Sequence, residues 1–519
     1  VYGGDITVSQ DFTSTASNAE ILLKASGNIQ VQDTVSVQAN GGDLIFWSNS
    51  DGSNGGNVLT GQTVTLDSRQ GGANTGGGRI YIGGGADTNS DGFPDGPAAG
   101  IGNSEGGAAY GILFGTAAGS GVQLLSGGGG ITLKGAVDPS FTADANSHGI
   151  GFYPGYTIDA GAGSVSFEGS ANSGGATTIG IDLMTFGASN ASSITTTGAL
   201  TLNGVTTVAN GGGNHGLILN TGLTVNAATV DITGDSADAS ADASVILNGS
   251  INSTSDVELK ANTYSFSSGS ISGQATLTIE PLTSSTSFSS AFSTSGLTLG
   301  STLTGLTIGK PTNTANVTID TAIDVAGPIT VYGGDISVNE NLTATEAGAD
   351  VLLKGSGNIT LAASKSIVTN GGDITLWSNS DGETTNGGYI YLQDGVTLDS
   401  RTASDRAANG GTADDVGGGT ITLGGGSAGT TAPTGYALNN SNTIRGGINF
   451  GTESGVLRHD SDVTLLSGGG DISLKGQQTS AYNSDAAGLN AYEGFTLDAG
   501  KTGSITLVGS ALSGGSSVA

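Results

Sequence analysis

The sequence predicts an all-β protein, and specifically a right-handed parallel β-helix (β-solenoid) with loop insertions. Three observations support this fold class. A long stretch of the chain occurs twice, a short glycine-led strand motif recurs throughout, and Gly supplies 94 of the 519 residues while charged residues supply only 11%. Because Glu, Lys and Arg favour surface helices, their scarcity argues against a helical fold. A long repeat that is itself built from short repeats is typical of a solenoid.

The long repeat defines the domain organisation. Both copies begin with VYGGDI, and NGGDLIFWSNSDG at 40–52 returns nearly unchanged at 370–382. We therefore predict a first unit at 1–330 and a partial second unit at 331–519. Since no flexible tract separates them, we expect the second unit to continue the first in one solenoid rather than to form a hinged domain.

The short motif is a glycine followed by alternating polar and apolar residues. In the first unit it occupies, in chain order, residues 4–8, 27–31, 42–46, 78–82 and 163–167. Alternation over so short a run is typical of half-buried strands, and the glycine can take the positive φ of a corner. Strand-like triplets continue through 180–330 with fewer glycines. Such short strands fit the sides of a β-helix coil better than the hairpins of a sandwich.

Four segments interrupt this strand rhythm. They are residues 84–110, 136–156, 402–416 and 427–446. We expect them to form loops that project from the edges of the coils.

The net charge of −30 excludes some classes of partner. Repulsion disfavours nucleic acid and anionic membranes, so we expect no nucleic-acid partner. No run of 18 apolar residues occurs, so we expect no membrane insertion. With no Cys, a disulfide framework is excluded. The chain begins inside a motif that recurs internally, which suggests a piece of a longer protein.

Several phrases resemble a known family. GNIQVQ, GGDLIFWS, GSVSFEGS and LLSGGGGITLKG are similar to the repeat regions of filamentous-haemagglutinin-like proteins, which are large secreted bacterial adhesins. The resemblance extends over essentially the whole chain. It implies a right-handed β-helix, an extracellular or cell-surface location, and a role in adhesion or fibre formation. The secretion domain of that family is not visible here, so the export route stays open.

The first functional hypothesis is therefore a structural one. We expect an extracellular β-solenoid segment of a giant surface or fibre-forming protein, acting as a rigid rod. We expect its ends to continue into the same chain or to associate with other copies, because an uncapped solenoid edge exposes unpaired backbone groups.

The alternative is a surface that binds glycans or cell-surface receptors. Trp47 and Trp377 occupy the same strand position in the two copies, where alternation points them outward, so they are candidate surface contacts. Packing beneath an adjacent loop is the other interpretation of this pair.

One segment predicts a single calcium site. Asp87, Asn89, Asp91 and Asp95 lie in the sequence DTNSDGFPD, which matches the first part of an oxygen-ligand calcium loop. Loop position twelve is Ala98 rather than Glu, so we expect modest affinity. The alternative is a solvated turn.

We expect no enzymatic activity. Asp67–Arg69 and Asp399–Arg401 are the nearest approach to a polysaccharide-cleaving site, but an ion pair at a corner explains them more simply. Asp159 and Asp498 recur in the same tandem way. His148, His215 and His459 are isolated in sequence, so they do not suggest a metal site.

Overall fold

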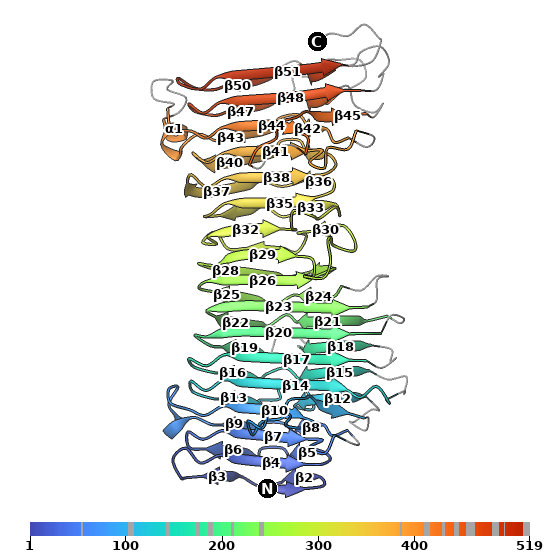
Figure 1. Cartoon of the computed structure of the whole chain (residues 1–519). Coiled ribbons are helices and arrows are strands. Elements are labelled where there is room, and N and C mark those ends of the chain that lie inside the picture. The colour runs from blue at the N-terminus through green and yellow to red at the C-terminus, as the bar shows by residue number, and fades with distance from the viewer. Residues whose placement is uncertain are drawn as a thin grey trace. The chain divides into compact units, whose positions relative to one another are not determined.

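The computed structural model describes residues 1–52, 55–101, 108–141, 146–172, 177–184, 190–208, 212–237, 243–384, 387–408, 416–427, 431–440, 446–452, 462–479, 487–492 and 494–511. These residues form short strands, together with one helix, α1 (Ala403–Ala407), and one 3₁₀ turn at Gln70–Gly72. The strands pair in parallel, and successive strands of the chain enter different sheets in turn, except that β10 and β11, and likewise β44 and β45, lie in the same sheet (Figure 1). The predicted parallel β-helix is therefore confirmed.

The chain divides into two compact units, Val1–Gln274 and Ala275–Ala519. This division lies upstream of the repeat boundary at 330/331. Whether the two copies form one continuous solenoid stays a prediction, and each unit is described by itself.

Unit 1 contains three parallel sheets (blue to green in Figure 1). The first sheet consists of β1 (Tyr2–Gly3), β4 (Ile21–Ala25), β7 (Leu44–Ser48), β10 (Ile80–Gly84), β11 (Ala98–Gly100), β14 (Ile131–Val137), β17 (Val165–Ala171), β20 (Ala199–Thr206), β23 (Thr229–Ser236) and β26 (Asp256–Ala261). The second consists of β2 (Ile6–Val8), β5 (Ile29–Val31), β8 (Val58–Thr60), β12 (Ala109–Phe114), β15 (Ser147–Phe152), β18 (Thr178–Leu183), β21 (Asn214–Leu219), β24 (Val245–Leu247) and β27 (Tyr264–Phe266). The third consists of β3 (Phe12–Ser14), β6 (Ser36–Ala39), β9 (Thr65–Asp67), β13 (Gln123–Leu125), β16 (Thr157–Asp159), β19 (Ser192–Thr195), β22 (Leu223–Ala227), β25 (Ser250–Ser253) and β28 (Gly269–Gly273).

Unit 2 repeats this arrangement. Its first sheet consists of β29 (Thr276–Glu280), β32 (Gly305–Ile308), β35 (Ile329–Gly333), β38 (Val351–Gly355), β41 (Ile374–Ser378), β44 (Ile421–Gly425), β45 (Ala437–Asn439), β48 (Ile472–Gln478) and β51 (Ile505–Ala511). The second consists of β30 (Phe292–Ser293), β33 (Val317–Ile319), β36 (Ile336–Val338), β39 (Ile359–Leu361), β42 (Ile390–Leu392), β46 (Gly446–Phe450) and β49 (Ala487–Ala491). After β31 (Leu297–Leu299), the third consists of β34 (Ile323–Val325), β37 (Leu342–Ala347), β40 (Ser366–Asn370), β43 (Thr397–Asp399), β47 (Thr464–Leu466) and β50 (Thr496–Asp498).

The core of each unit is built from columns of inward side chains. In unit 1, for example, Leu23 pairs in register with Phe46, and Phe46 with Ile82. All three side chains are at most 1% exposed. Each coil therefore places its aliphatic or aromatic residue directly on that of the next coil, which buries a continuous apolar interior.

Acidic residues at the corners join neighbouring coils. The Oδ1 atom of Asp43 accepts the backbone N–H of Arg79, one coil later, at 2.7 Å. Asp471 accepts the backbone N–H of Ser504 in the same way at 2.8 Å, and this bond is the main cause that lowers the pKa of Asp471. Carboxylates that follow the glycine of the short motif thus satisfy backbone donors that would otherwise lack a partner.

The expectation of loops was partly wrong for 84–110, 136–156 and 427–446. Strand β11 (Ala98–Gly100) lies inside the first segment, and β45 (Ala437–Asn439) lies inside the third. Strand β12 begins at Ala109, and β15 occupies Ser147–Phe152 inside the second of these segments. The sequence hid β15 because Gly149 and Gly151 replace the side chains that would have shown alternation.

Candidate functional site

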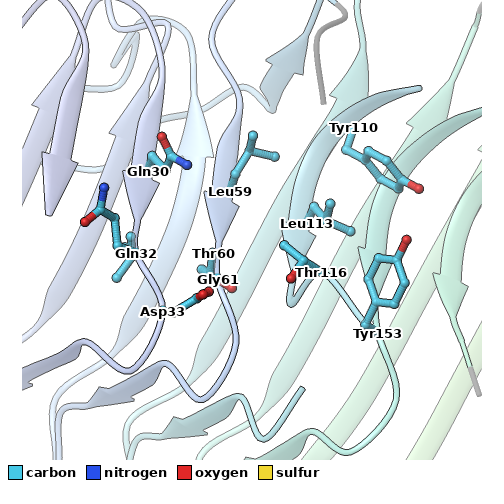
Figure 2. Close-up of a pocket in the computed structure, with 11 residues that line it drawn as sticks. Gln30, Gln32, Asp33, Leu59, Thr60, Gly61, Tyr110, Leu113, Thr116 and Tyr153 are labelled. Atoms are coloured by element: carbon cyan, nitrogen blue, oxygen red, sulfur yellow. The ribbon is translucent and has the colours of Figure 1, made fainter. Parts of the chain in front are cut away.

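The outer face of the second sheet of unit 1 carries a groove with a volume of about 500 Å³. We call it the sheet-two groove, and its lining residues are Gln30, Val31, Gln32, Asp33, Leu59, Thr60, Gly61, Tyr110, Leu113, Thr116 and Tyr153. Figure 2 shows these side chains converging from several coils. The groove is therefore a product of coil stacking and not of any one sequence motif.

A register column forms the floor of the groove. Gln30 of β5 pairs with Leu59 of β8, Leu59 with Leu113 of β12, and Leu113 with Gly151 of β15. Leu113 is only 7% exposed and forms a cluster with Tyr110 and Met184, against which Leu59 and Tyr153 pack. The outward face of these coils is thus apolar in the middle, where a solvated strand would carry Thr, Ser or Asn.

The rings of Tyr110 and Tyr153 form the aromatic wall of the groove, and Gly151 leaves space for the Tyr110 ring. A Cβ atom added there would lie 3.0 Å from the ring of Tyr110 and 3.2 Å from Leu113. The Tyr110 ring thus extends over Gly151, and its hydroxyl end lies towards that of Tyr153 in Figure 2. Burial is the main cause that raises the pKa of Tyr110, and the nearby Tyr153 and Asp182 add to it. The phenol of Tyr110 is therefore neutral at physiological pH and can donate and accept hydrogen bonds.

The rim of the groove is polar. Gln30, Gln32, Asp33 and Thr116 are exposed. The Oδ1 atom of Asp33 accepts the backbone N–H of Gln62 at 2.7 Å, so the corner fixes the orientation of this carboxylate. The rim can accordingly accept and donate hydrogen bonds above an apolar floor.

A buried pair, His148 and Asp182, lies next to the Tyr110 ring of the aromatic wall. Nδ1 of His148 lies 3.3 Å from Oδ2 of Asp182, and the two residues are 4% and 6% exposed. The imidazole of His148 stacks on the Tyr110 ring at a centroid distance of 4.9 Å. His148 is therefore not isolated, because its partner lies on the next coil, where sequence spacing alone could not reveal it.

The second copy lacks this groove chemistry. Register places Tyr391 at the position of Leu59, Asn449 at that of Leu113, and Gly446 at that of Tyr110. The position of Gly151 is taken by Asn490, whose Cβ lies 3.2 Å from where a Cβ of Gly446 would be. In unit 1 the large residue Tyr110 faces Gly151 of the next coil, whereas in unit 2 the small residue Gly446 faces Asn490. The second copy therefore has no ring at the position of Tyr110.

The two Trp residues do not form surface contacts. Trp47 is 4% exposed and donates its indole N–H to the carbonyl oxygen of Gly85 at 2.6 Å. Trp377 is 1% exposed and donates to Gly426 at 2.8 Å. Alternation does place Trp47 with the outward Ile45, but Phe93 of the following loop covers both. The expectation of exposed stacking faces is corrected to packing beneath a loop.

The candidate calcium residues lie in one loop, which its own hydrogen bonds hold. The backbone N–H of Asp91 donates to Asp87 at 3.2 Å and to Asn89 at 2.9 Å. Asn89 also donates through Nδ2 to Asp95 at 3.0 Å. Bonds from Thr88 are the main cause that lowers the pKa of Asp95. The oxygens of Asp87, Asn89 and Asp95 thus gather at the loop, although an ion would have to displace the Asn89–Asp95 bond.

Lys134 forms a hydrogen bond with the same loop. Its ammonium donates to the carbonyl oxygen of Asp95 at 3.3 Å, which places a positive charge beside the loop. Within the described part of the chain, no group of three His, Cys, Asp or Glu side chains is placed to hold a metal ion. Calcium binding stays a prediction.

The tandem Asp–Arg pairs are corner ion pairs. Arg69 binds Asp67 through two nitrogens at 2.7 and 2.9 Å, and Arg401 binds Asp399 at 2.8 and 3.0 Å. Bidentate pairing within two residues occupies both carboxylate oxygens. The predicted ion pair is thus present in both copies.

Register places Asp159 two coils from Asp67 in one column, and Asp498 two coils from Asp399. Asp159 and Asp498 each accept the backbone N–H of the glycine two residues later, at 2.9 Å. His215 makes a hydrogen bond through Nδ1 with the carbonyl oxygen of Ala243 at 2.8 Å, and His459 lies outside the described residues.

The sequence carries only a weak signal of the groove. The outward positions of β12 and β18 include the apolar Leu113 and Ile179, but Gly151 and Asp182 occupy the column of Leu113. Among the described helices, none is long and apolar enough to cross a membrane.

The chain matches no protein-family model, no curated protein and no solved structure to which it was compared.

Proposed function

We propose that this chain is an extracellular structural and adhesive β-solenoid segment of a giant surface or fibre-forming protein, similar to the filamentous-haemagglutinin-like adhesins. Its role is mechanical: each unit is a stiff spacer, and we propose no catalytic activity. The observation that carries this proposal is the register of inward apolar residues from coil to coil in the first sheet of each unit.

The physical reason is that each coil in such a stack is stabilised by its contacts with the neighbouring coils. Most coils are hydrogen-bonded to their neighbours through three parallel ladders, which pair the backbone donors and acceptors of the strands. Stability is then approximately a sum of coil and interface terms. A spacer built in this way resists proteolysis along its strands, which suits a surface exposed to the environment.

Localisation gives the direct test. Antibodies raised against the purified chain should label intact producing cells at their surface. Labelling only after permeabilisation would contradict the proposal, and a cytosolic marker antibody is the control for intact cells.

Self-association is the partner that we propose first. Apolar residues are exposed on the outermost described coils: Tyr2 is 77% and Leu507 is 52% exposed. A second copy, or further coils of the same chain, would cover them. Negative-stain micrographs of the purified chain should show end-to-end filaments, and only short particles of uniform size would contradict this assembly.

A surface that binds glycans or receptors is the second candidate function. The sheet-two groove favours it, because this groove combines a concave apolar floor with a polar rim. The Trp residues no longer support it, since both are buried.

We further predict one weak calcium site at the DTNSDGFPD loop. Titration calorimetry should give one site per chain with a dissociation constant of roughly 10⁻⁴–10⁻³ M, the range of extracellular calcium modules. Asp91→Ala should abolish the binding, because it removes a carboxylate at the centre of the loop. Asp381→Ala, in a turn outside this loop, is the control. Unchanged binding in the Asp91 variant, or no binding by the original chain, would contradict the site.

A further inference from the structure

We propose that the sheet-two groove binds an uncharged sugar residue, as part of a neutral oligosaccharide. This inference rests on the second candidate function above and names its ligand class. It is independent of the mechanical role, since the stack of coils does not need the groove.

The first argument is shape. A volume of about 500 Å³ lies within the usual range for small-ligand pockets, which is roughly 300–1,000 Å³. The floor consists of Leu59 and Leu113, with the rings of Tyr110 and Tyr153 beside it (Figure 2). A pyranose ring has an apolar face of C–H groups and an edge of hydroxyl groups. Such a floor suits the C–H face.

The second argument is hydrogen-bond type. The exposed amides of Gln30 and Gln32 each offer a carbonyl oxygen and two N–H donors, and Thr116 offers a hydroxyl. Sugar hydroxyls also donate and accept at once. A rim that combines donors and acceptors above an apolar floor therefore matches a polyol better than it matches a purely apolar ligand.

The third argument is charge. Asp33 is the only charged side chain among the lining residues, and none of them is Lys, Arg or His. The whole chain carries −30. Uronate, sialate and sulfated sugars would therefore be repelled, whereas a neutral sugar can donate a hydroxyl to the carboxylate of Asp33.

The backbone around the groove argues against a peptide occupant. Extended peptides usually bind by adding a strand to a sheet edge, where unpaired N–H and C=O groups are available. The groove lies on the face of the sheet, and β8 and β12 are paired with neighbouring strands on both sides. Recognition there must come from side chains.

The second copy offers an internal control. Tyr492 corresponds to Tyr153, and the backbone N–H of each donates to the equivalent Phe carbonyl oxygen, at 3.1 Å from Tyr492 to Phe450 and at 2.9 Å from Tyr153 to Phe114. Around Tyr492, however, Gly446 replaces Tyr110 and Ala363 replaces Asp33. A substitution at Tyr492 should therefore leave sugar binding unchanged.

Saturation-transfer difference NMR with short neutral oligosaccharides of glucose, galactose and mannose tests the proposal. Oligomers of the corresponding uronic acids are the charged comparison, and an unstructured neutral peptide is the non-sugar comparison. At least one neutral series should show saturable transfer, and the uronic acids and the peptide should show none. Tyr153→Ala and Gly151→Asn should each weaken binding at least tenfold, the first by removing the wall and the second by filling the space beneath Tyr110.

Folding is monitored by circular dichroism, and Asp33→Asn provides a milder variant at an exposed position. With Asp33→Asn, discrimination against uronic acids should decrease. Three results would each overturn the proposal: no saturable binding of any neutral series, equal binding of uronic acids or the peptide, or binding that Tyr153→Ala leaves as strong as Tyr492→Ala does. None of them affects surface labelling, so failure of this proposal is distinguishable from failure of the mechanical one.

Discussion

Replacing Phe152 by Ala is expected to destabilise unit 1 by about 3–5 kcal/mol, the usual cost of removing a buried Phe side chain. The Phe152 ring is fully buried and stacks on Phe114 at a centroid distance of 4.4 Å. It also lies 4.7 Å from Tyr156 and 5.7 Å from Phe167. Three aromatic rings thus surround Phe152, and removal of its ring leaves a cavity that the rigid ladders cannot close.

Hydrogen–deuterium exchange followed by mass spectrometry is the appropriate measurement. Because each coil contacts only its neighbours, the loss should be local. Exchange should accelerate in β12, β15 and β17 and stay unchanged in unit 2. Phe152→Leu, which keeps most of the volume, should cost less than about 1.5 kcal/mol. Equal effects of the Ala and Leu variants would contradict the proposed stack.

The position that corresponds to Phe152 in unit 2 carries a small residue. Register puts Ala491 where unit 1 has Phe152, since Phe450 pairs with Ala491 as Phe114 pairs with Phe152. Phe450 and Phe495 lie farther apart there, at 6.2 Å. The two copies thus share a backbone plan, but Ala491 is exposed whereas Phe152 is fully buried, so no equivalent aromatic stack forms at this position of unit 2.

The second large effect is expected at the paired Trp residues. Trp47→Ala and Trp377→Ala should each cost about 3–5 kcal/mol, because each removes a buried indole. Each indole also interacts with a lysine of the preceding coil: the ammonium of Lys24 lies 3.3 Å from the Trp47 ring centroid, and that of Lys354 lies 3.9 Å from that of Trp377. These contacts join three elements, namely two coils and the loop that covers the indole.

Thermal unfolding and exchange rates of the covering loops provide the measurement. Trp47→Phe keeps most of the apolar area but loses the N–H bond to Gly85, so it should cost about 1–2 kcal/mol. Adhesion or sugar binding should not change in the Phe variants. A Trp47→Ala protein that is as stable as the original would show that the indole is not covered, and would restore it as a candidate contact.

The outcome for Trp47 illustrates where alternation stops being informative. Strand periodicity correctly placed its side chain opposite the inward Phe46, and it carried no information on the loop above. Phe93 and Gly85 belong to a segment that the sequence marked only as an insertion. The fold of an insertion depends on what it finds on the coil beneath it, so burial of an outward residue needs the tertiary structure.

The sequence by itself determined the parallel β-helix, the position of the corners and the corner ion pair of Asp67 with Arg69, because these depend on residues within one coil or on a period that repeats. Only the tertiary structure decided the sheet-two groove and the His148–Asp182 pair. Both depend on which outward side chains stand above one another after coils of unequal length have been stacked. Each insertion changes the number of residues per coil, so the partner of a given side chain is fixed by register and not by spacing in the sequence.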